Sequence, residues 1–232
     1  MSIIYKYPVR MLVACSLVTV MIGCGQEERN VPARAESTAS AEDPTVLFLG
    51  TSLTAGYGLP TDLAYPALLQ EKIDSAGIPF QVVNAGLSGE TSAGALRRLD
   101  WLLRQPFEVI VIETGANDML RGTDLDVTMG NIQAIIDRVR EERPDVEIVL
   151  AGMRAPPNLG NEYTREFREI YPDLADRNDL PLIPFLLQDV AGEPELNQAD
   201  GIHPNAAGQE IVAENVWAVL KPVLERSAAA TP

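Results

Sequence analysis

Short apolar runs alternate with stretches of helical periodicity, and this alternation limits most strongly how the 232-residue chain can fold. Five runs have the length and β-branched content of buried strands: 45–50, 80–86, 108–115, 146–153 and 180–185. Several are almost continuously apolar, which is typical of parallel strands covered on both faces. Between and after these runs, apolar residues recur at helical spacing, for example at Leu125, Met129, Ile132, Ile136 and Val139. The alternation predicts an α/β fold, a three-layer α/β/α sandwich around a central parallel sheet of about five strands.

Residues 1–23 have the composition of an export signal. Lys6 and Arg10 precede a 13-residue apolar run, too short to span a bilayer, and Cys24 follows it directly. This order resembles a lipoprotein signal, so we expect a lipid on Cys24 and a place on the periplasmic side of a bacterial membrane. Gly25 carries no inner-membrane retention signal, which favours the outer membrane. An ordinary cleaved signal, cut after Ala-Arg-Ala at 33–35, is the alternative.

The rest of the chain divides into a tether, one domain and a short tail. Residues 24–44 contain the lipidation cysteine and a polar stretch typical of a flexible tether, 45–226 suit one globular domain, and 227–232 form a tail. The domain contains no cysteine and the chain only one histidine, so we predict no disulfide, no metal site and no cofactor. The net charge of −15 argues against nucleic acid or anionic lipid headgroups as partners.

Polar residues suited to acyl transfer follow the predicted strands. Ligands bind beyond the carboxyl ends of strands in such sheets, where Ser52, Gly86 and Asn117 follow the first, second and third runs. The loop before the last helix carries Asp200 and His203, spaced so that the carboxylate can fold back onto the imidazole. Singly, each residue also has a structural explanation, such as a helix cap, a strand end or a turn. Together they supply a hydroxyl, a base with its carboxylate, and two donors for an oxyanion.

Other glycine-rich motifs do not fit the segment 49–58. A P-loop requires a Lys that is absent before Lys72, and a dinucleotide fingerprint requires a third glycine. The nucleophile elbow of α/β-hydrolases requires glycine at position 54, where this chain has Thr54.

Four blocks carry a resemblance to a known family. GTSL at 50–53, NAGLSGETS at 84–92, GAND at 115–118 and DGIHP at 200–204 stand in the order of the SGNH (GDSL) hydrolases. The likeness covers about 45–225, and it is strongest to the periplasmic lysophospholipase, acyl-thioesterase and arylesterase branch. The resemblance implies a flavodoxin-like fold and a serine esterase that acts on acyl esters, thioesters or lysophospholipid-like substrates.

The resemblance also assigns roles to the site residues. It implies Ser52 as nucleophile, His203 as base and Asp200 as the group that orients the base. It implies an oxyanion hole formed by the Ser52 N–H, the Gly86 N–H and the Asn117 side chain.

Two neighbouring positions call for comment under this resemblance. Thr51 stands where the family has Asp, and we expect this change to alter the support of the nucleophile turn rather than to remove the reaction. Asp118 belongs to a family block but is expected to be a structural partner rather than a second base.

The segment 153–163 follows the fourth predicted strand and mixes apolar residues with Pro and Gly. We expect Pro157 and Leu159 in it to line an acyl pocket, with a plain connecting loop as the alternative. Two other functions remain open from the sequence: an O-acetylesterase of envelope polysaccharide, and a non-catalytic binding protein with the same fold.

Overall fold

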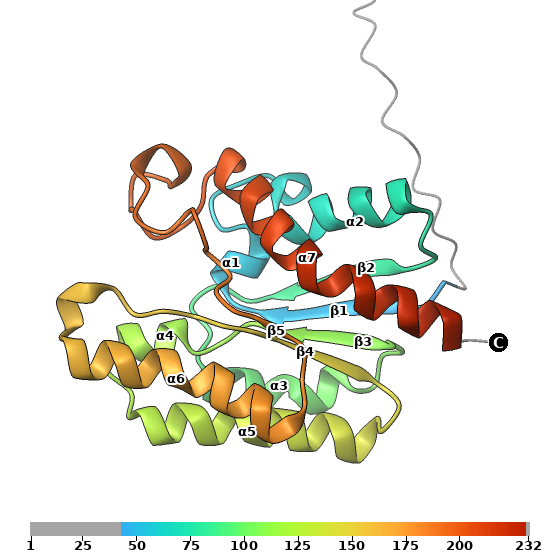
Figure 1. The fold of residues 1–232 in the computed structure, drawn as a ribbon, viewed down its shortest axis with the longest axis horizontal. Coiled ribbons are helices and arrows are strands. Elements are labelled where there is room, and N and C mark those ends of the chain that lie inside the picture. The colour runs from blue at the N-terminus through green and yellow to red at the C-terminus, as the bar shows by residue number, and fades with distance from the viewer. Residues whose placement is uncertain (1–42, 231–232) are drawn as a thin grey trace, which may run out of the picture. The chain divides into compact units, whose positions relative to one another are not determined.

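A computed structural model describes residues 43–230 of the chain. Its five strands are β1 (Thr45–Gly50), β2 (Gln81–Gly86), β3 (Val109–Ile112), β4 (Glu147–Ala151) and β5 (Leu182–Ile183). They form one sheet in the order β2-β1-β3-β4-β5, and every pair is parallel (Figure 1). The predicted signal, Cys24 and all but the end of the predicted tether lie outside the described residues.

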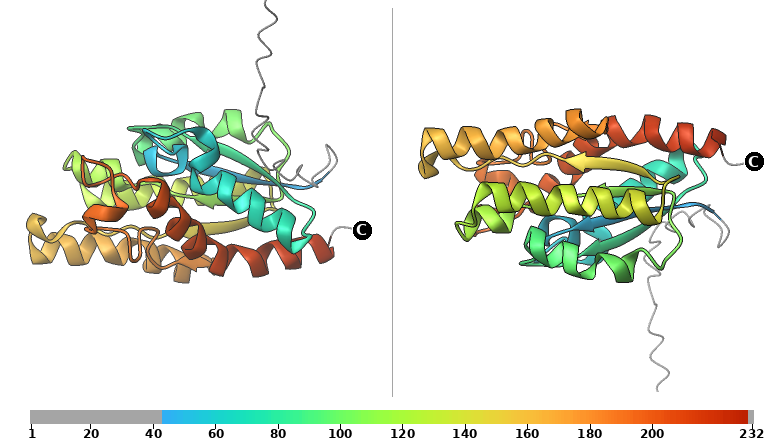
Figure 2. Two further views of the ribbon diagram at one scale, coloured as in Figure 1. Left: turned by 90° about the horizontal axis from the view of Figure 1, so that it is seen from above. Right: turned by 90° about the horizontal axis from the view of Figure 1, so that it is seen from below.

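The helices cover both faces of this sheet. They are α1 (Ser52–Ala55), α2 (Tyr65–Ala76), α3 (Ser92–Leu102), α4 (Ala116–Leu120), α5 (Leu125–Glu142), α6 (Asn161–Asn178) and α7 (Ala206–Ala230). Short 3-10 turns lie at Thr61–Leu63, Pro157–Leu159 and Pro194–Leu196. One face is covered by α2 and α7, and the other by α3, α5 and α6 (Figures 1 and 2). The predicted three-layer α/β/α architecture is confirmed.

The central strands form the core because helices pack on both of their faces. Residues 46–49 of β1 and 109–112 of β3 are at most 1% exposed. The predicted spacing in α5 is also found, with Ile132, Ile136 and Val139 fully buried. The last helix continues to Ala230, four residues beyond the predicted end of the domain at 226. Among the described residues, no helix combines the length and the apolarity needed to cross a membrane.

Strands β3 and β5 are at most half as long as their apolar runs predict. The third run extends to residue 115, but β3 ends at Ile112 because Glu113 turns towards the end of β1 and accepts hydrogen bonds there. The fifth run was expected over 180–185, but β5 contains only Leu182 and Ile183. Pro181 and Pro184 flank these two residues, and proline has no N–H to extend a ladder.

Candidate active site

Ser52 occupies the turn where the central strand β1 gives way to a helix. β1 ends at Gly50, and Ser52 is the first residue of the four-residue helix α1. A Cβ at position 50 would collide with the Thr54 hydroxyl, so only glycine fits there. The serine is 9% exposed, and its Oγ faces a histidine instead of capping the helix.

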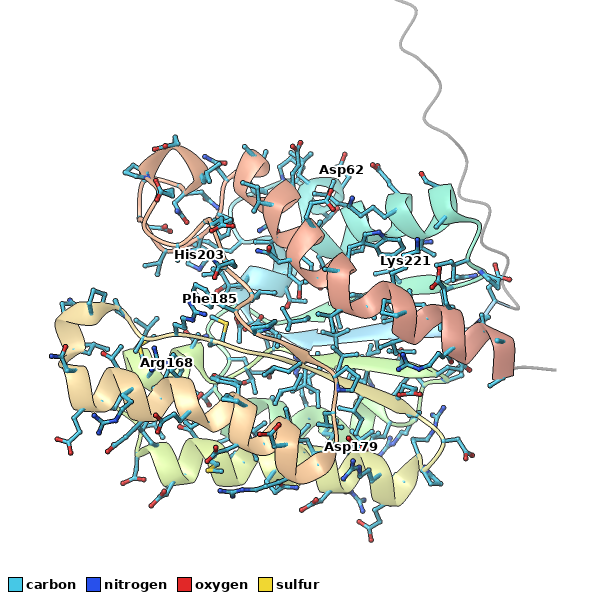
Figure 3. The ribbon with its side chains drawn as sticks, viewed as in Figure 1. Asp62, Arg168, Asp179, Phe185, His203 and Lys221 are labelled. Carbon is cyan, nitrogen blue, oxygen red and sulfur yellow. The ribbon has the colours of Figure 1, made fainter. Side chains whose placement is uncertain are left out.

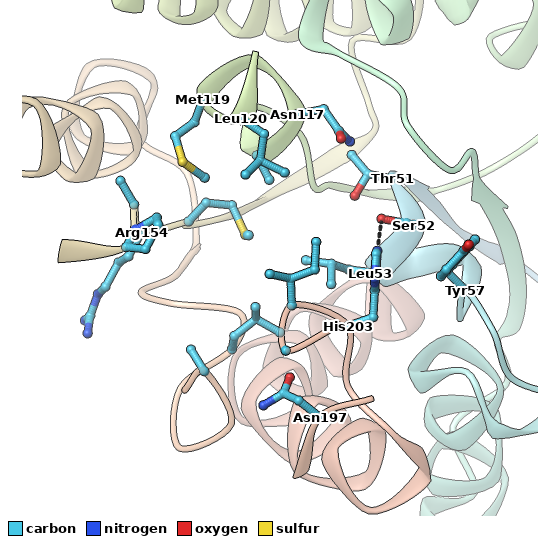
Figure 4. Close-up of a pocket in the computed structure, with 18 of the residues that line it drawn as sticks. Thr51, Ser52, Leu53, Tyr57, Asn117, Met119, Leu120, Arg154, Asn197 and His203 are labelled. Carbon is cyan, nitrogen blue, oxygen red and sulfur yellow. Dashed lines mark hydrogen bonds between the residues drawn. The ribbon is translucent and has the colours of Figure 1, made fainter. Parts of the chain in front are cut away.

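His203 lies directly against this serine although 151 residues separate them. Its Nε2 is 2.9 Å from Ser52 Oγ (Figure 4). Its Nδ1 is 2.7 Å from Asp200 Oδ2. With the proton on Nδ1, the imidazole donates to the carboxylate and its Nε2 accepts from the serine hydroxyl. The structure therefore brings the three predicted residues into one continuous chain of hydrogen bonds.

Asp200 is held in place by its own loop. While Oδ2 faces the imidazole, Oδ1 accepts the N–H groups of Ile202 and His203 at 3.0 and 3.1 Å. The hydrogen bond from His203, followed by these backbone bonds, lowers the pKa of Asp200 to about 2. The carboxylate consequently stays ionised far into the acid range, and it both caps the turn and orients the base.

The segment 197–204 supports His203 from the other side. Gln198 N–H donates to the His203 carbonyl at 2.8 Å, and the Gln198 side chain donates to the carbonyls of Pro204 and Tyr57. The Tyr57 ring lies 4.7 Å from the His203 ring, centroid to centroid. The base is thus positioned by hydrogen bonds within a surface loop, at the same edge of the sheet as Phe185 (Figure 3).

The structure does not support the prediction that the Gly86 N–H is an oxyanion donor. Gly86 is paired in register with Gly50 inside the sheet, and its N–H donates to Asn84 Oδ1 at 2.9 Å. Gly86 does not line the cavity in front of Ser52, whereas Gly89 does. Gly89 lies in the turn after β2 with a φ of +78°, a conformation that favours glycine. The second glycine of NAGLSGETS, placed in a turn rather than at the strand end, is the signal that identifies it.

The other predicted donors do face the cavity. Asn117, in α4, lines it and uses one Nδ2–H for the Glu90 carbonyl at 3.0 Å, which leaves the second N–H for a ligand. Within residues 43–230, the backbone N–H groups of Ser52 and Gly89 donate to no other protein group. Three donors are therefore available at one edge of the sheet.

Charged residues behind this edge fix the loop that carries Gly89. The Arg98 guanidinium binds the Glu90 carboxylate at 2.6–2.9 Å and the Ala85 carbonyl at 2.7 Å. Asp118 accepts the Ser92 N–H at 2.7 Å and the Ser92 hydroxyl at 2.6 Å, at the start of α3. Asp118 is a structural partner, as expected.

Beneath Ser52 lies a buried carboxyl, Glu113, that was not predicted from the sequence. Glu113 is 0% exposed and accepts the Thr51 N–H at 2.7 Å, the Thr51 hydroxyl at 2.9 Å and the Thr54 hydroxyl at 2.8 Å. Burial raises the pKa of Glu113 to about 7. No spacing rule reveals this residue, because it lies at the end of a neighbouring strand and reads as part of an apolar run.

The cavity in front of Ser52 has a volume of about 560 Å³ and mostly apolar walls. Its apolar lining includes Leu53, Met119, Leu120, Met153, Phe185, Leu187 and Ile202. Pro157 lines it as predicted, but Leu159 does not and is 42% exposed. Arg154 lies far from Ser52 in the cavity, with its guanidinium 4.6 Å from the centre of the Phe185 ring (Figure 4). Within the described part of the chain, no three His, Cys, Asp or Glu side chains are grouped as metal ligands would be.

Comparison with known proteins agrees with this geometry. The profile of the GDSL-like lipase/acylhydrolase family matches residues 48–211. Esterase TesA of Pseudomonas aeruginosa is 40% identical over 188 residues, which cover 81% of this chain and 92% of the relative. The arylesterase of Vibrio mimicus is 38% identical over 181 residues, or 78% of this chain and 90% of that protein.

Solved structures give the same result. The crystal structure of TesA has a TM-score of 0.74 at 40% identity, and the match covers 77% of this chain and 99% of that one. Psychrotrophic esterase EstA from Pseudoalteromonas sp., in a structure inhibited by monoethylphosphonate, has a TM-score of 0.73 at 35% identity. This match covers 79% of this chain and 100% of that one. The chain therefore belongs to the GDSL-like lipase/acylhydrolase family, as a carboxylic ester hydrolase of the branch that contains TesA.

Proposed function

We propose that the protein hydrolyses acyl esters through an acyl-enzyme, with Ser52 as nucleophile, His203 as base and Asp200 as the residue that orients the base. The observation that carries this proposal is the hydrogen-bond chain from Ser52 Oγ through the His203 ring to Asp200 Oδ2. The family membership supports the reaction class, and the mostly apolar cavity in front of the serine supports an acyl substrate.

In the first half-reaction, Ser52 Oγ bonds to the acyl carbon while His203 Nε2 accepts the hydroxyl proton. The carbonyl electron pair moves onto its oxygen, which the N–H groups of Ser52, Gly89 and Asn117 stabilise. Loss of one such donor costs about 2.7–4 kcal/mol of transition-state stabilisation in a measured case. Asp200 stabilises the imidazolium, which then gives its proton to the departing alcohol or thiol. In the second half-reaction, water replaces the serine oxygen on the acyl carbon with the same histidine as base.

The substrate class follows from the walls of the cavity. The volume of about 560 Å³ exceeds what an acetyl group needs, so the cavity favours longer acyl chains over the acetyl groups of an envelope polysaccharide. Tyr57 is 51% exposed beside the histidine that protonates the leaving group, which places an aromatic surface where an aryl leaving group would lie. A relative from Escherichia coli is named thioesterase 1/protease 1/lysophospholipase L1, and we extend the proposal to thioesters and lysophospholipid-like esters.

A fluorophosphonate probe tests the nucleophile. The intact protein should form an adduct that peptide mass spectrometry places on Ser52, and Ser52→Ala should form none. Ser88 also lines the cavity but lacks a histidine partner, so Ser88→Ala is the matched control and should react like the wild type. An adduct elsewhere, or no adduct together with no turnover of p-nitrophenyl esters of two to twelve carbons, would favour a non-catalytic binding protein.

We also propose that the protein is exported and held on the periplasmic side of the outer membrane by a lipid on Cys24. The support is the sequence alone, namely the basic residues, the short apolar run and the cysteine that follows it. Fractionation of cells that express the full chain tests this. The wild type should be in the membrane fraction and Cys24→Ser in the soluble fraction, whereas equal distribution of the two would point to an ordinary cleaved signal.

A further inference from the structure

Glu113 is a fully buried carboxyl that the proposed reaction does not use. It directly follows β3, and its hydrogen-bond partners are Thr51, just before the nucleophile, and Thr54, two residues after it. Thr51 precedes Ser52 and donates both its N–H and its hydroxyl to Glu113, while Thr54 on the first turn of α1 donates its hydroxyl. The carboxyl therefore determines the position of the turn that carries Ser52 from below.

The packing around this contact leaves little freedom. A Cβ on Gly50 would lie 2.8 Å from Glu113 Oε2, in addition to its collision with Thr54. Asn84 also restrains this turn, because its side chain donates a hydrogen bond to the Thr54 carbonyl at 2.8 Å. A change in the length or shape of the side chain at 113 must consequently move the Ser52 N–H and hydroxyl together.

The charges around Glu113 do not neutralise it. On the α2 side, the Tyr65 hydroxyl bonds to the Thr54 hydroxyl at 2.7 Å, and on the α6 side Tyr171 donates to the Thr114 carbonyl. Burial raises the pKa of both tyrosines, and the Glu113 charge adds to this, so both are neutral.

The neighbouring charges on α3 and α4 are already engaged. Arg98 reaches the Gly50 carbonyl at 3.4 Å, but its guanidinium is paired with Glu90. Asp118 is an anion and is bound to Ser92. Among residues 43–230 no basic side chain makes a hydrogen bond or ion pair to Glu113, and desolvation accordingly raises its pKa to about 7.

Both protonation states of Glu113 can satisfy the surrounding donors. When ionised, the carboxylate accepts all three bonds from Thr51 and Thr54. When neutral, its own proton can go to Thr51 Oγ1, whose hydrogen then turns towards the cavity that Thr51 lines. The turn therefore keeps its shape in both states, and what changes is one negative charge beneath the oxyanion donors.

We propose that Glu113 is a positioning residue for the reaction of Ser52 and that its uncharged form is the active one. The inference rests on the proposed function. A negative charge below the Ser52 N–H opposes the negative charge that develops on the acyl oxygen, since like charges repel strongly where water is excluded. The neutral carboxyl supports the same turn without this repulsion.

The pH dependence of kcat and KM tests this, measured from pH 5 to pH 9 on the full chain with a p-nitrophenyl ester. Glu113→Gln keeps the size and an acceptor oxygen but cannot ionise. We expect the ratio of its kcat to the wild-type kcat to rise about thirtyfold between pH 6 and pH 8.5, with KM unchanged, because the uncharged fraction of Glu113 falls from about nine tenths to about one thirtieth over this range. The contacts of His203 with Ser52 and Asp200 do not involve Glu113, so a change in this ratio with pH reports on Glu113. A ratio that stays constant with pH overturns the inference.

Two further variants keep the test decisive. Glu113→Ala removes the support and should lower kcat at least about tenfold at every pH, with Ser52 still labelled by the probe. If Glu113→Gln does not fold, Thr51→Val replaces it. This variant removes one donor that favours the ionised carboxyl, so the decline of activity at alkaline pH should move to higher pH. A decline in the same place as the wild type's contradicts the inference. Absence of turnover by the wild type would overturn the proposed function. Turnover by the wild type with a kcat ratio that does not change with pH would overturn only the inference about Glu113, so the two failures can be distinguished.

Discussion

The two halves of the catalytic arrangement are built in different ways. The nucleophile turn, residues 50–54, lies in the core, with Thr51 and Thr54 at most 1% exposed and bonded to a buried carboxyl. The base loop, residues 197–204, lies at the surface, where the Asp200 side chain is 39% exposed. Its order comes from short-range hydrogen bonds, such as those of Gln198 to His203 and Pro204.

This difference separates the stability of the protein from its chemistry. Changes in the nucleophile turn leave buried donors without partners, which costs free energy of folding. Changes in the base loop expose groups that water already reaches, so they should affect the reaction far more than the fold. Among the hydrogen bonds of residues 43–230, the one between Ser52 and His203 is the only one that joins the two halves directly.

The largest expected effect tests whether the halves act as one unit. Ser52→Ala and His203→Ala should each lower kcat about 10⁴-fold or more, and the double variant should be little worse than either single one, because each residue is useless without the other. Ester hydrolysis measures this, and circular dichroism confirms that the variants are folded. Losses that multiply in the double variant would mean that the two residues act separately.

The next effect contrasts the stability of the halves. Glu113→Ala should lower the free energy of unfolding by about 3 kcal/mol or more in urea denaturation, since three buried donors lose their acceptor. Asp200→Ala should leave it close to the wild-type value although activity is lost. Equal losses of stability in the two variants would contradict the contrast between core and surface.

The same stability should depend on pH through Glu113. Its pKa is about 7 in the folded protein and 4.5 as a free side chain, so between these values the folded state binds more proton than the unfolded state. Stability therefore falls as pH rises from about 4.5 through about 7, by a few kcal/mol at most, at about 1.4 kcal/mol per unit. Glu113→Gln should abolish the fall. The pKa of Asp200 is lowered to about 2, so its effect on stability changes only below about pH 4, outside this window, and Asp200 therefore provides the control.

The smallest effect concerns two leucines outside both halves. Leu120 is 56% exposed and lines the cavity, whereas Leu159 is 42% exposed and does not. Leu120→Ala should lower kcat/KM for an octanoyl or longer ester about three- to tenfold and leave the acetyl ester unchanged, since only long chains bury that side chain. Leu159→Ala is the matched control. If it changed chain-length preference as much as Leu120→Ala, the cavity would extend further than its walls indicate.

The features that depend on periodicity, and most of the residues in the family motifs, could be predicted from the sequence. The parallel sheet followed from apolar runs, and Ser52, Asn117, Asp200 and His203 were predicted from their places after strands and in motifs. The structure brings the two residues of the base loop within hydrogen-bond distance of each other and of Ser52.

The errors concern features that depend on three-dimensional packing. Gly86 and Gly89 stand in the same motif, and only the register of β2 against β1 shows that Gly86 is inside the sheet. Glu113 is a single polar residue in an apolar run, and its contact with Thr51 spans 62 positions of the chain. Thr51 was noted as a departure from the family, but that its hydroxyl binds this carboxyl could not be inferred from local sequence.

His203 is the only histidine of the chain, and it lies between the nucleophile and its carboxylate. The magnetic resonance spectrum of the unlabelled protein should thus contain one set of imidazole signals, free of overlap from other histidines. The tautomer of the base, its ionisation and its response to an inhibitor can all be followed from that single set.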